Sequence, residues 1–238
     1  MDKLNLDDHI SQQFNDELEE IRNHVMIMGG MVEQQTADAI RALVEGDSAL
    51  GQRVVHDDHK VNDLEVMIDE ECNRILARRQ PAASDLRLVV AIIKTITDLE
   101  RIGDEAEKIG YLATRLAEAE RPGNAYSELE HLGDHVRSML RTALDAFARM
   151  DPEAAVAVAK EDSKVDREYE AILRQCVTFM MEDPRTIRRV LDMIWCARAL
   201  ERIGDHAKNI CEYVVYLVHG KDVRHIDIED VEREIRDI

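Results

Sequence analysis

The chain has 238 residues, of which 45% are hydrophobic and only 4% aromatic, with ten glycines and four prolines. Its 50 acidic and 31 basic residues give a formal charge of −19, which repels nucleic-acid phosphates and anionic lipid headgroups. This composition is typical of a folded, helix-rich protein, and it argues against a disordered chain and against a nucleic-acid binder.

The cellular compartment follows from the N-terminus and the cysteines. The opening sequence MDKLNLDDHISQQF has no apolar core of signal-peptide length, and no run of about 18 apolar residues occurs anywhere in the chain. The cysteines form no CxxC pair and lie among apolar residues, which is typical of buried thiols in a reducing compartment; they are Cys72, Cys176, Cys196 and Cys211. We therefore expect a cytoplasmic protein that does not insert into a membrane.

Three helices are predicted in the first half. Apolar residues recur every three or four positions from about residue 10 to Glu45, where Gly46-Asp47-Ser48 supplies a stop and an N-cap. A second run begins at Leu50 and ends at Gln80-Pro81. Ser84-Asp85 is expected to cap the third helix, which ends near the turn cluster Arg121-Pro122-Gly123-Asn124.

The same pattern restarts after that turn. A fourth helix is predicted up to Met150, and Asp151-Pro152-Glu153 provides a cap, a first-turn proline and an acid for the next helix. The fifth helix ends at Asp183-Pro184, and the sixth runs from about Thr186 to Val218 and closes at Gly220. No segment alternates as a strand would.

The two halves resemble each other. Lys60-Val61 and Cys72 recur 104 positions later as Lys164-Val165 and Cys176, and the hexapeptide LERIGD occurs at 99–104 and at 200–205. The sequence therefore predicts an all-α fold of two tandem, pseudo-symmetric three-helix bundles with six helices. The expected divisions are 1–121, 122–220 and a charged tail at 221–238.

Each LERIGD copy places a Glu and an Asp four residues apart, on one side of a helix. In the first copy, Glu100 and Asp104 fall on the same arc as the apolar stripe of their helix. Carboxylates that leave water without partners cost several kcal/mol each, so such acids require cations or hydrogen-bond donors. The duplication makes an accidental arrangement less credible.

Residues opposite the acids follow from the tight turns between antiparallel helices. A turn centred on Pro81 places Glu100 opposite Asn62 and Asp104 opposite Asp58. A turn at Asp183-Pro184 places the second pair opposite further acids: Glu201 faces Asp166 and Asp205 faces Asp162.

These facing positions carry no Lys or Arg, so the acids would repel one another unless a multivalent cation lies between them. Ligation by oxygen alone favours Mg, Mn or Fe over structural zinc. The alternative is that these carboxylates are solvated, or paired with Arg101 and Arg202 of neighbouring helices.

Two other constellations suggest different roles. Glu128 and His131 have the ExxH spacing of di-iron bundles, which leaves a ferritin-like di-metal enzyme as an alternative, and a plain helical scaffold is another. No nucleophile arrangement or phosphate loop is present. His206 is expected to be an exposed helical histidine, and Trp195 is expected to pack inside.

The tandem units and the doubled LERIGD(E/H)A(E/K)(K/N)I sequence resemble the PhoU family, over about residues 10 to 219. The resemblance implies a non-enzymatic, usually dimeric cytoplasmic regulator that represses the phosphate-starvation response when phosphate is plentiful. It implies partners at the inner membrane, namely the phosphate ABC transporter, with its ATPase subunit, and a sensor histidine kinase.

Some members of that family carry multinuclear metal clusters on pairs of E(D)xxxD motifs. Carried across, those motifs are Glu100 with Asp104 and Glu201 with Asp205, and Asp162 with Asp166 also fits. Asn62 departs from the acid expected beside Asp58, which implies a weaker or differently occupied first site.

Overall fold

The computed structural model describes residues 12–118, 126–224, 226 and 228–236. A short 3-10 helix (Pro184–Thr186) precedes α7. The α-helices are α1 (Gln12–Glu45), α2 (Ser48–Asp57), α3 (His59–Arg79), α4 (Ala83–Ala117), α5 (Ser127–Arg149), α6 (Pro152–Glu182), α7 (Ile187–His219) and α8 (Ile228–Arg236). Within the described ranges no strand is present, so the all-α prediction is confirmed.

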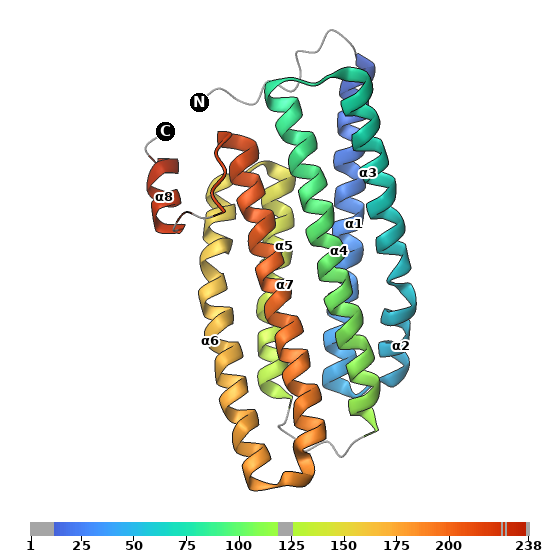
Figure 1. Ribbon diagram of the computed structural model, residues 1–238, viewed down its shortest axis with the longest axis vertical. Coiled ribbons are helices and arrows are strands. Elements are labelled where there is room, and N and C mark those ends of the chain that lie inside the picture. Colours follow the sequence, from blue (N-terminus) through green and yellow to red (C-terminus); the bar gives the residue numbers. More distant parts are fainter. Residues whose placement is uncertain (1–11, 119–125, 225, 227, 237–238) are drawn as a thin grey trace.

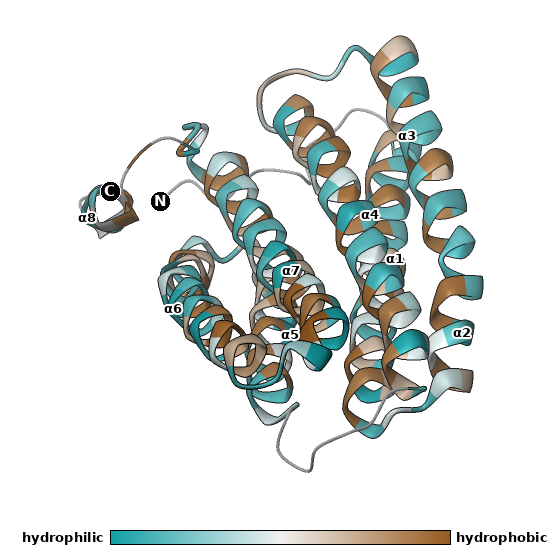
Figure 2. Ribbon diagram, turned by 60° about the horizontal axis from the view of Figure 1, so that its bottom comes forward, coloured by the Kyte–Doolittle hydropathy of each residue, from teal (hydrophilic) through white to brown (hydrophobic). Residues whose placement is uncertain are grey.

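The long helices run side by side along the longest axis of the molecule (Figure 1). On one side α1 and the segment made of α2 and α3 pack with α4, and on the other side α5 and α6 pack with α7. The two sets meet where α4 packs on α7 and α1 packs on α5. Apolar and polar residues alternate around each helix, as the periodicity predicted (Figure 2).

Several helix ends lie where the sequence placed them. Gly46 adopts a left-handed φ of 71°, and the Asp47 carboxylate then accepts a hydrogen bond from the Leu50 amide at 2.9 Å. Asp151 caps α6 in the same way, accepting from the Ala154 amide at 3.0 Å. Gly220 ends α7 with a φ of 72°. Glycine has no Cβ and adopts these left-handed conformations at little cost.

Other helix boundaries differ from the prediction. The predicted second helix is interrupted at Asp58, which separates α2 from α3 while keeping helical dihedral angles (φ −57°, ψ −36°). Helix α4 begins at Ala83, so Ser84-Asp85 lies inside its first turn and does not cap it. The predicted turn at 121–124 lies outside the described residues. The charged tail contains α8, whose Val231 is buried.

Helix α2 approaches α4 at the level of the backbone. A Cβ added at Gly51 would lie 2.6 Å from the Gly110 carbonyl oxygen, which is closer than real Cβ atoms come to other atoms. Only glycine at this crossing lets the two helices lie so close. The contact holds the N-terminal part of α2 against α4.

Polar side chains cross the interface between α4 and α7. Asp98 is buried and pairs with His206 Nδ1 at 2.6 Å, and it accepts a hydrogen bond from Asn209 Nδ2 at 3.0 Å. Glu105, also buried, forms an ion pair with Arg202. The prediction of an exposed His206 is therefore wrong, because its partner lies in the other half of the chain.

The surface carries a line of large apolar side chains on α7. Ile187, Leu191 and Trp195 follow one another at intervals of four and are 42%, 44% and 53% exposed. The prediction that Trp195 packs inside is therefore wrong.

The four cysteines are free and buried, as expected. Among the described helices, none combines the length and the apolarity that crossing a bilayer demands.

Candidate metal-binding clusters

The first cluster is built around Asp58. This residue is only 6% exposed, and its carboxylate accepts hydrogen bonds from Gln35 Nε2 at 2.8 Å and from Asn62 Nδ2 at 3.2 Å. Oxygens of Asp58, Asp104 and Glu107 all lie within 4.8 Å of one another. The predicted pairing of Asp58 with Asp104 is thus present, and Glu107, which the sequence analysis did not select, joins it.

Two amide oxygens beside Asp58 make this a suitable place for a cation. Gln35 Oε1 and Asn62 Oδ1 are buried and accept no hydrogen bond from the described residues. A Cβ at Gly103 would lie 3.2 Å from Asp58 Oδ1 and 3.4 Å from Gln35 Oε1, so the missing side chain leaves room for these oxygens. Hard cations favour such a set of carboxylate and amide oxygens.

Glu100 extends the first cluster along α4. Burial, followed by the negative charge of Asp104, raises the pKa of Glu100 above its usual value. Burial also raises the pKa of Glu65 on α3, another acid that the sequence analysis did not select, and Asp69 contributes next. The Arg101 guanidinium lies 3.5 Å from both Glu100 and Asp104, so it balances one of these charges at a half-exposed position.

Repulsion between the other acids is visible in their pKa values. For Asp104, burial is the largest cause of a raised pKa and the charge of Asp58 is the next. The same two causes, in the same order, raise the pKa of Glu107. The cluster therefore holds its negative charge at a cost that a bound cation would remove.

The second cluster consists of acids on α6 and α7 that raise one another's pKa. The pKa of Asp205 is raised by burial first and then by Asp162, and the pKa of Glu201 is raised by burial and then by Asp205, with Asp166 also contributing. For Asp166, burial and then Asp162 raise the pKa. The acids predicted to face each other across α6 and α7 therefore do interact.

Two basic side chains of α7 reach the second cluster. Lys208 Nζ donates to Asp162 Oδ2 at 2.7 Å, and Arg198 pairs with Glu201. Arg202, the predicted alternative partner, instead reaches Glu105 in the other half. The expectation of acids without a basic partner is wrong for this cluster, because the basic residues come from neighbouring turns rather than from the facing positions.

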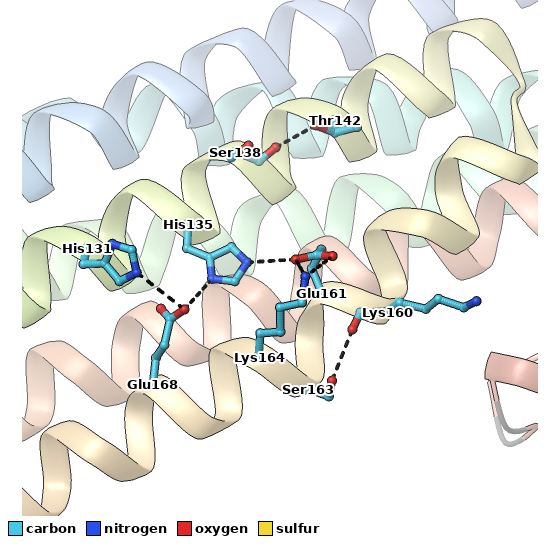
Figure 3. Close-up of polar contacts among 9 residues, drawn as sticks. All are labelled: His131, His135, Ser138, Thr142, Lys160, Glu161, Ser163, Lys164 and Glu168. Carbon is cyan, nitrogen blue, oxygen red and sulfur yellow. Dashed lines mark hydrogen bonds and ion pairs between the residues drawn. The ribbon is translucent and has the colours of Figure 1, made fainter.

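His131 belongs to a different group (Figure 3). Its Nε2 lies 3.8 Å from Glu168 Oε1 on α6, and the side chain is 72% exposed. His135 Nδ1 contacts the same oxygen at 3.0 Å, and its Nε2 lies 3.4 Å from Glu161 Oε2. The ExxH pair of Glu128 and His131 therefore does not form the inward-facing arrangement that a ferritin-like centre requires.

Comparisons with known proteins agree with one another. The PhoU domain family matches residues 25–113 and 129–214. The chain is 56% identical over 236 residues to the phosphate-specific transport system accessory protein PhoU homolog of Pseudomonas putida, covering 99% of this chain and 92% of that protein. It is 55% identical over 234 residues to the phosphate-specific transport system accessory protein PhoU of Escherichia coli (strain K12), covering 98% and 96%.

Solved structures give the same result. The crystal structure of PhoU from Pseudomonas aeruginosa superposes with a TM-score of 0.85 at 56% identity, covering 87% of this chain and all of that one. The phosphate transport system regulatory protein PhoU from Streptococcus pneumoniae superposes with a TM-score of 0.82 at 30% identity, covering 88% and 99%.

Proposed function

Because this chain belongs to the PhoU family, we propose that it represses the phosphate-starvation response and phosphate uptake as the accessory protein of a phosphate-specific transport system. The observation that carries the proposal is the 55–56% identity, over nearly the whole chain, to proteins with that name. Members of the family are regulatory and accessory proteins, not enzymes, and this chain is one of them.

The protein acts by contacting partners at the cytoplasmic face of the inner membrane. These partners are the phosphate ABC transporter, through its ATPase subunit, and a sensor histidine kinase. The line of Ile187, Leu191 and Trp195 on α7 supports this role, because exposed apolar side chains gathered on one face mark protein-binding surfaces. Tyr111 on α4 is 54% exposed, and Lys108 Nζ lies 5.6 Å from the Trp195 ring. We assign this face to the transporter.

The acid clusters bind divalent or trivalent metal, with Mn, Mg or Fe preferred to Zn. Asp58, Asn62, Glu100 and Asp104 would hold it in the first half, and Asp162, Asp166, Glu201 and Asp205 in the second. Asn62 implied that the first cluster binds metal more weakly, but the charges favour the first cluster. Glu107 adds an acid to it, whereas Lys208 brings an ammonium to the second cluster. Bound metal orders the surface of the helices and supplies no reaction step.

The docking face can be tested by co-purification. Leu191→Glu with Trp195→Glu should lower the recovery of the transporter ATPase subunit about tenfold and raise the activity of a phosphate-starvation promoter in cells. Val66→Glu, at a 58% exposed apolar position on α3, is the matched control and should leave both unchanged. If the double variant recovered the transporter ATPase subunit in full, the assignment of the α7 face to the transporter would be wrong. If deletion of the protein left the promoter repressed, the proposed function itself would be wrong.

A further inference from the structure

A mixed group of ligands lies on α1 and α3, away from both acid clusters. Glu20 and His24 are one turn apart on α1, and Glu71 comes from α3. His24 Nδ1 lies 2.8 Å from Glu71 Oε2, and ligand atoms of all three residues lie within 4.8 Å of one another. We propose that these residues form a separate site for a borderline divalent metal such as Zn²⁺.

The donor set distinguishes this site from the clusters around LERIGD. One imidazole nitrogen and two carboxylates suit Zn²⁺, Co²⁺ or Ni²⁺, whereas the clusters offer oxygen alone and suit harder cations. Two of the ligands come from a single turn of a long helix, and the third comes from its packed neighbour, so the backbone fixes the spacing of the three positions, although the Glu20 side chain is exposed. His24 and Glu71 side chains are 23% and 17% exposed, which limits their freedom further.

The local charge favours a cation. In the described part of the chain, neither Glu20 nor Glu71 forms an ion pair with a lysine or an arginine. Arg79, on the same helix as Glu71, donates instead to both oxygens of Glu17 at 2.7 and 3.0 Å. With a neutral imidazole, the three ligands carry two negative charges, which one dication balances.

Space for further ligands adjoins the group. A groove of about 400 Å³ is lined by Glu20 and Glu71 together with Asp16, Arg74 and Arg78, among others. Glu20 and Glu71 open onto this groove, which leaves coordination positions for water, as in zinc sites with three protein ligands. The acids that line this groove outnumber the two arginines, so its lining is negative on balance.

A second histidine provides an internal control. Both ring nitrogens of His135 face carboxylates, Glu168 at 3.0 Å and Glu161 at 3.4 Å, and Lys164 Nζ lies 2.7 Å from Glu161 Oε2 (Figure 3). His135 therefore already has partners on both sides, one of them bridged to an ammonium. It is not expected to bind the metal.

The test is a Zn²⁺ titration of metal-free protein in competition with a chromophoric chelator. His24→Ala and, separately, Glu71→Gln should each weaken one Zn²⁺ equivalent about 100-fold or more. His135→Ala should leave that equivalent unchanged. Asp104→Asn combined with Glu107→Gln should also leave it unchanged, which separates this site from the metal clusters of the proposed function. Circular dichroism checks that each variant is folded.

The location of the metal is measured on the same samples. A crystal soaked in Zn²⁺ should show an anomalous peak at roughly 2.1 Å from His24 Nδ1. Unchanged Zn²⁺ affinity in both folded variants, His24→Ala and Glu71→Gln, would overturn the proposal. So would an equal loss in His135→Ala, because the binding would then not depend on this group of ligands.

Discussion

The acid clusters of the two halves occupy equivalent helix positions but meet different charges. Glu107 on α4 and Lys208 on α7 are 101 positions apart, the same offset as the LERIGD copies. Glu107 adds a carboxylate beside Asp58, whereas Lys208 places its ammonium on the equivalent Asp162. At the same offset, Thr97 corresponds to Arg198, which pairs with Glu201.

The position of the acids and the source of the charge that balances them are separate properties of each half. The hexapeptide places the acids on α4 and α7, and the residues one turn before and after it decide where the balancing charge comes from. In the second half the chain provides that charge itself. In the first half, Arg101 at the edge and the more distant Arg202 lower the pKa of Asp104 only in part, and the remaining balancing charge is expected from solution.

The largest expected effect concerns cation binding to the first cluster. Asp104→Asn with Glu107→Gln should weaken Mn²⁺ binding there about 100-fold or more, because two of three converging carboxylates are lost. Asp205→Asn is the counterpart in the second half and should change the strongest Mn²⁺ site less than threefold. Isothermal titration and electron paramagnetic resonance of Mn²⁺ measure both. Equal losses in the two variants would mean that the halves do not differ.

The second expected effect is on packing, where the halves also differ. Gly51→Ala should lower the free energy of unfolding by about 2–3 kcal/mol, because the added Cβ meets the Gly110 backbone. The equivalent positions of the second half hold Ala155 and Cys211, so that half does not rely on such an approach. Gly30→Ala is the control. Nothing lies within 4 Å of its added Cβ, so it should be neutral or stabilising by up to about 1 kcal/mol. Urea denaturation measures the free energy of unfolding of both variants. Similar losses in Gly51→Ala and Gly30→Ala would contradict the close contact between α2 and α4.

The third prediction gives the second cluster the acid that the first cluster has at the equivalent position. Lys208→Glu removes the ammonium from Asp162 and should strengthen Mn²⁺ binding to the second cluster about tenfold. Lys160→Glu, two residues before Asp162 on α6 and paired with Glu232 of α8, is a control for the change in net charge. Should both variants gain affinity alike, the gain would reflect overall charge rather than the position of Lys208.

The smallest expected effect is on the pH dependence of stability. Burial and neighbouring acids raise the pKa of Glu100 and Asp104 in the folded protein, so the folded state binds protons at higher pH than the unfolded chain. Without metal, stability from these groups therefore increases as the pH falls from 7 towards about 4.5. We expect the melting temperature to rise by a few degrees at most, because both groups are partly screened by solvent.

The same measurement with saturating Mn²⁺ provides the control. Bound metal stabilises the ionised carboxylates, so the gain at lower pH should disappear or reverse. Glu100→Gln with Asp104→Asn should remove this response to Mn²⁺. If the melting temperature of the metal-free protein and that of metal-free Glu100→Gln with Asp104→Asn depended on pH in the same way, the raised pKa values would be contradicted.

Helix positions could largely be predicted from the sequence, since they depend on local signals. Glycine and capping residues end and begin helices whatever the tertiary packing, and Gly46, Asp47 and Asp151 act as predicted. The break at Asp58 gave no such signal, because its dihedral angles stay helical and the apolar period continues across it. Helix α8 was missed because its segment reads as charged, although Val231 is buried.

The acid clusters could be predicted only in part. The register between antiparallel helices brought Asp58 to Asp104, as expected, and the charge of Asp162 contributes to the raised pKa of Asp205. The balancing charges depend on how long side chains reach across turns, which spacing alone does not determine. Glu107 was nevertheless detectable, because it lies three residues after Asp104 and thus on the same face of α4.

The buried Asp98 at the junction of α4 and α7 has a consequence for how the molecule unfolds. Its partners His206 and Asn209 belong to the other half, and so does Arg202, which holds Glu105. Cutting the chain between the halves would leave Asp98 without those partners at an uncovered apolar helix face. We therefore expect a single calorimetric transition for the intact chain, and aggregation of either half when it is produced alone, because the two repeats share one cooperative core.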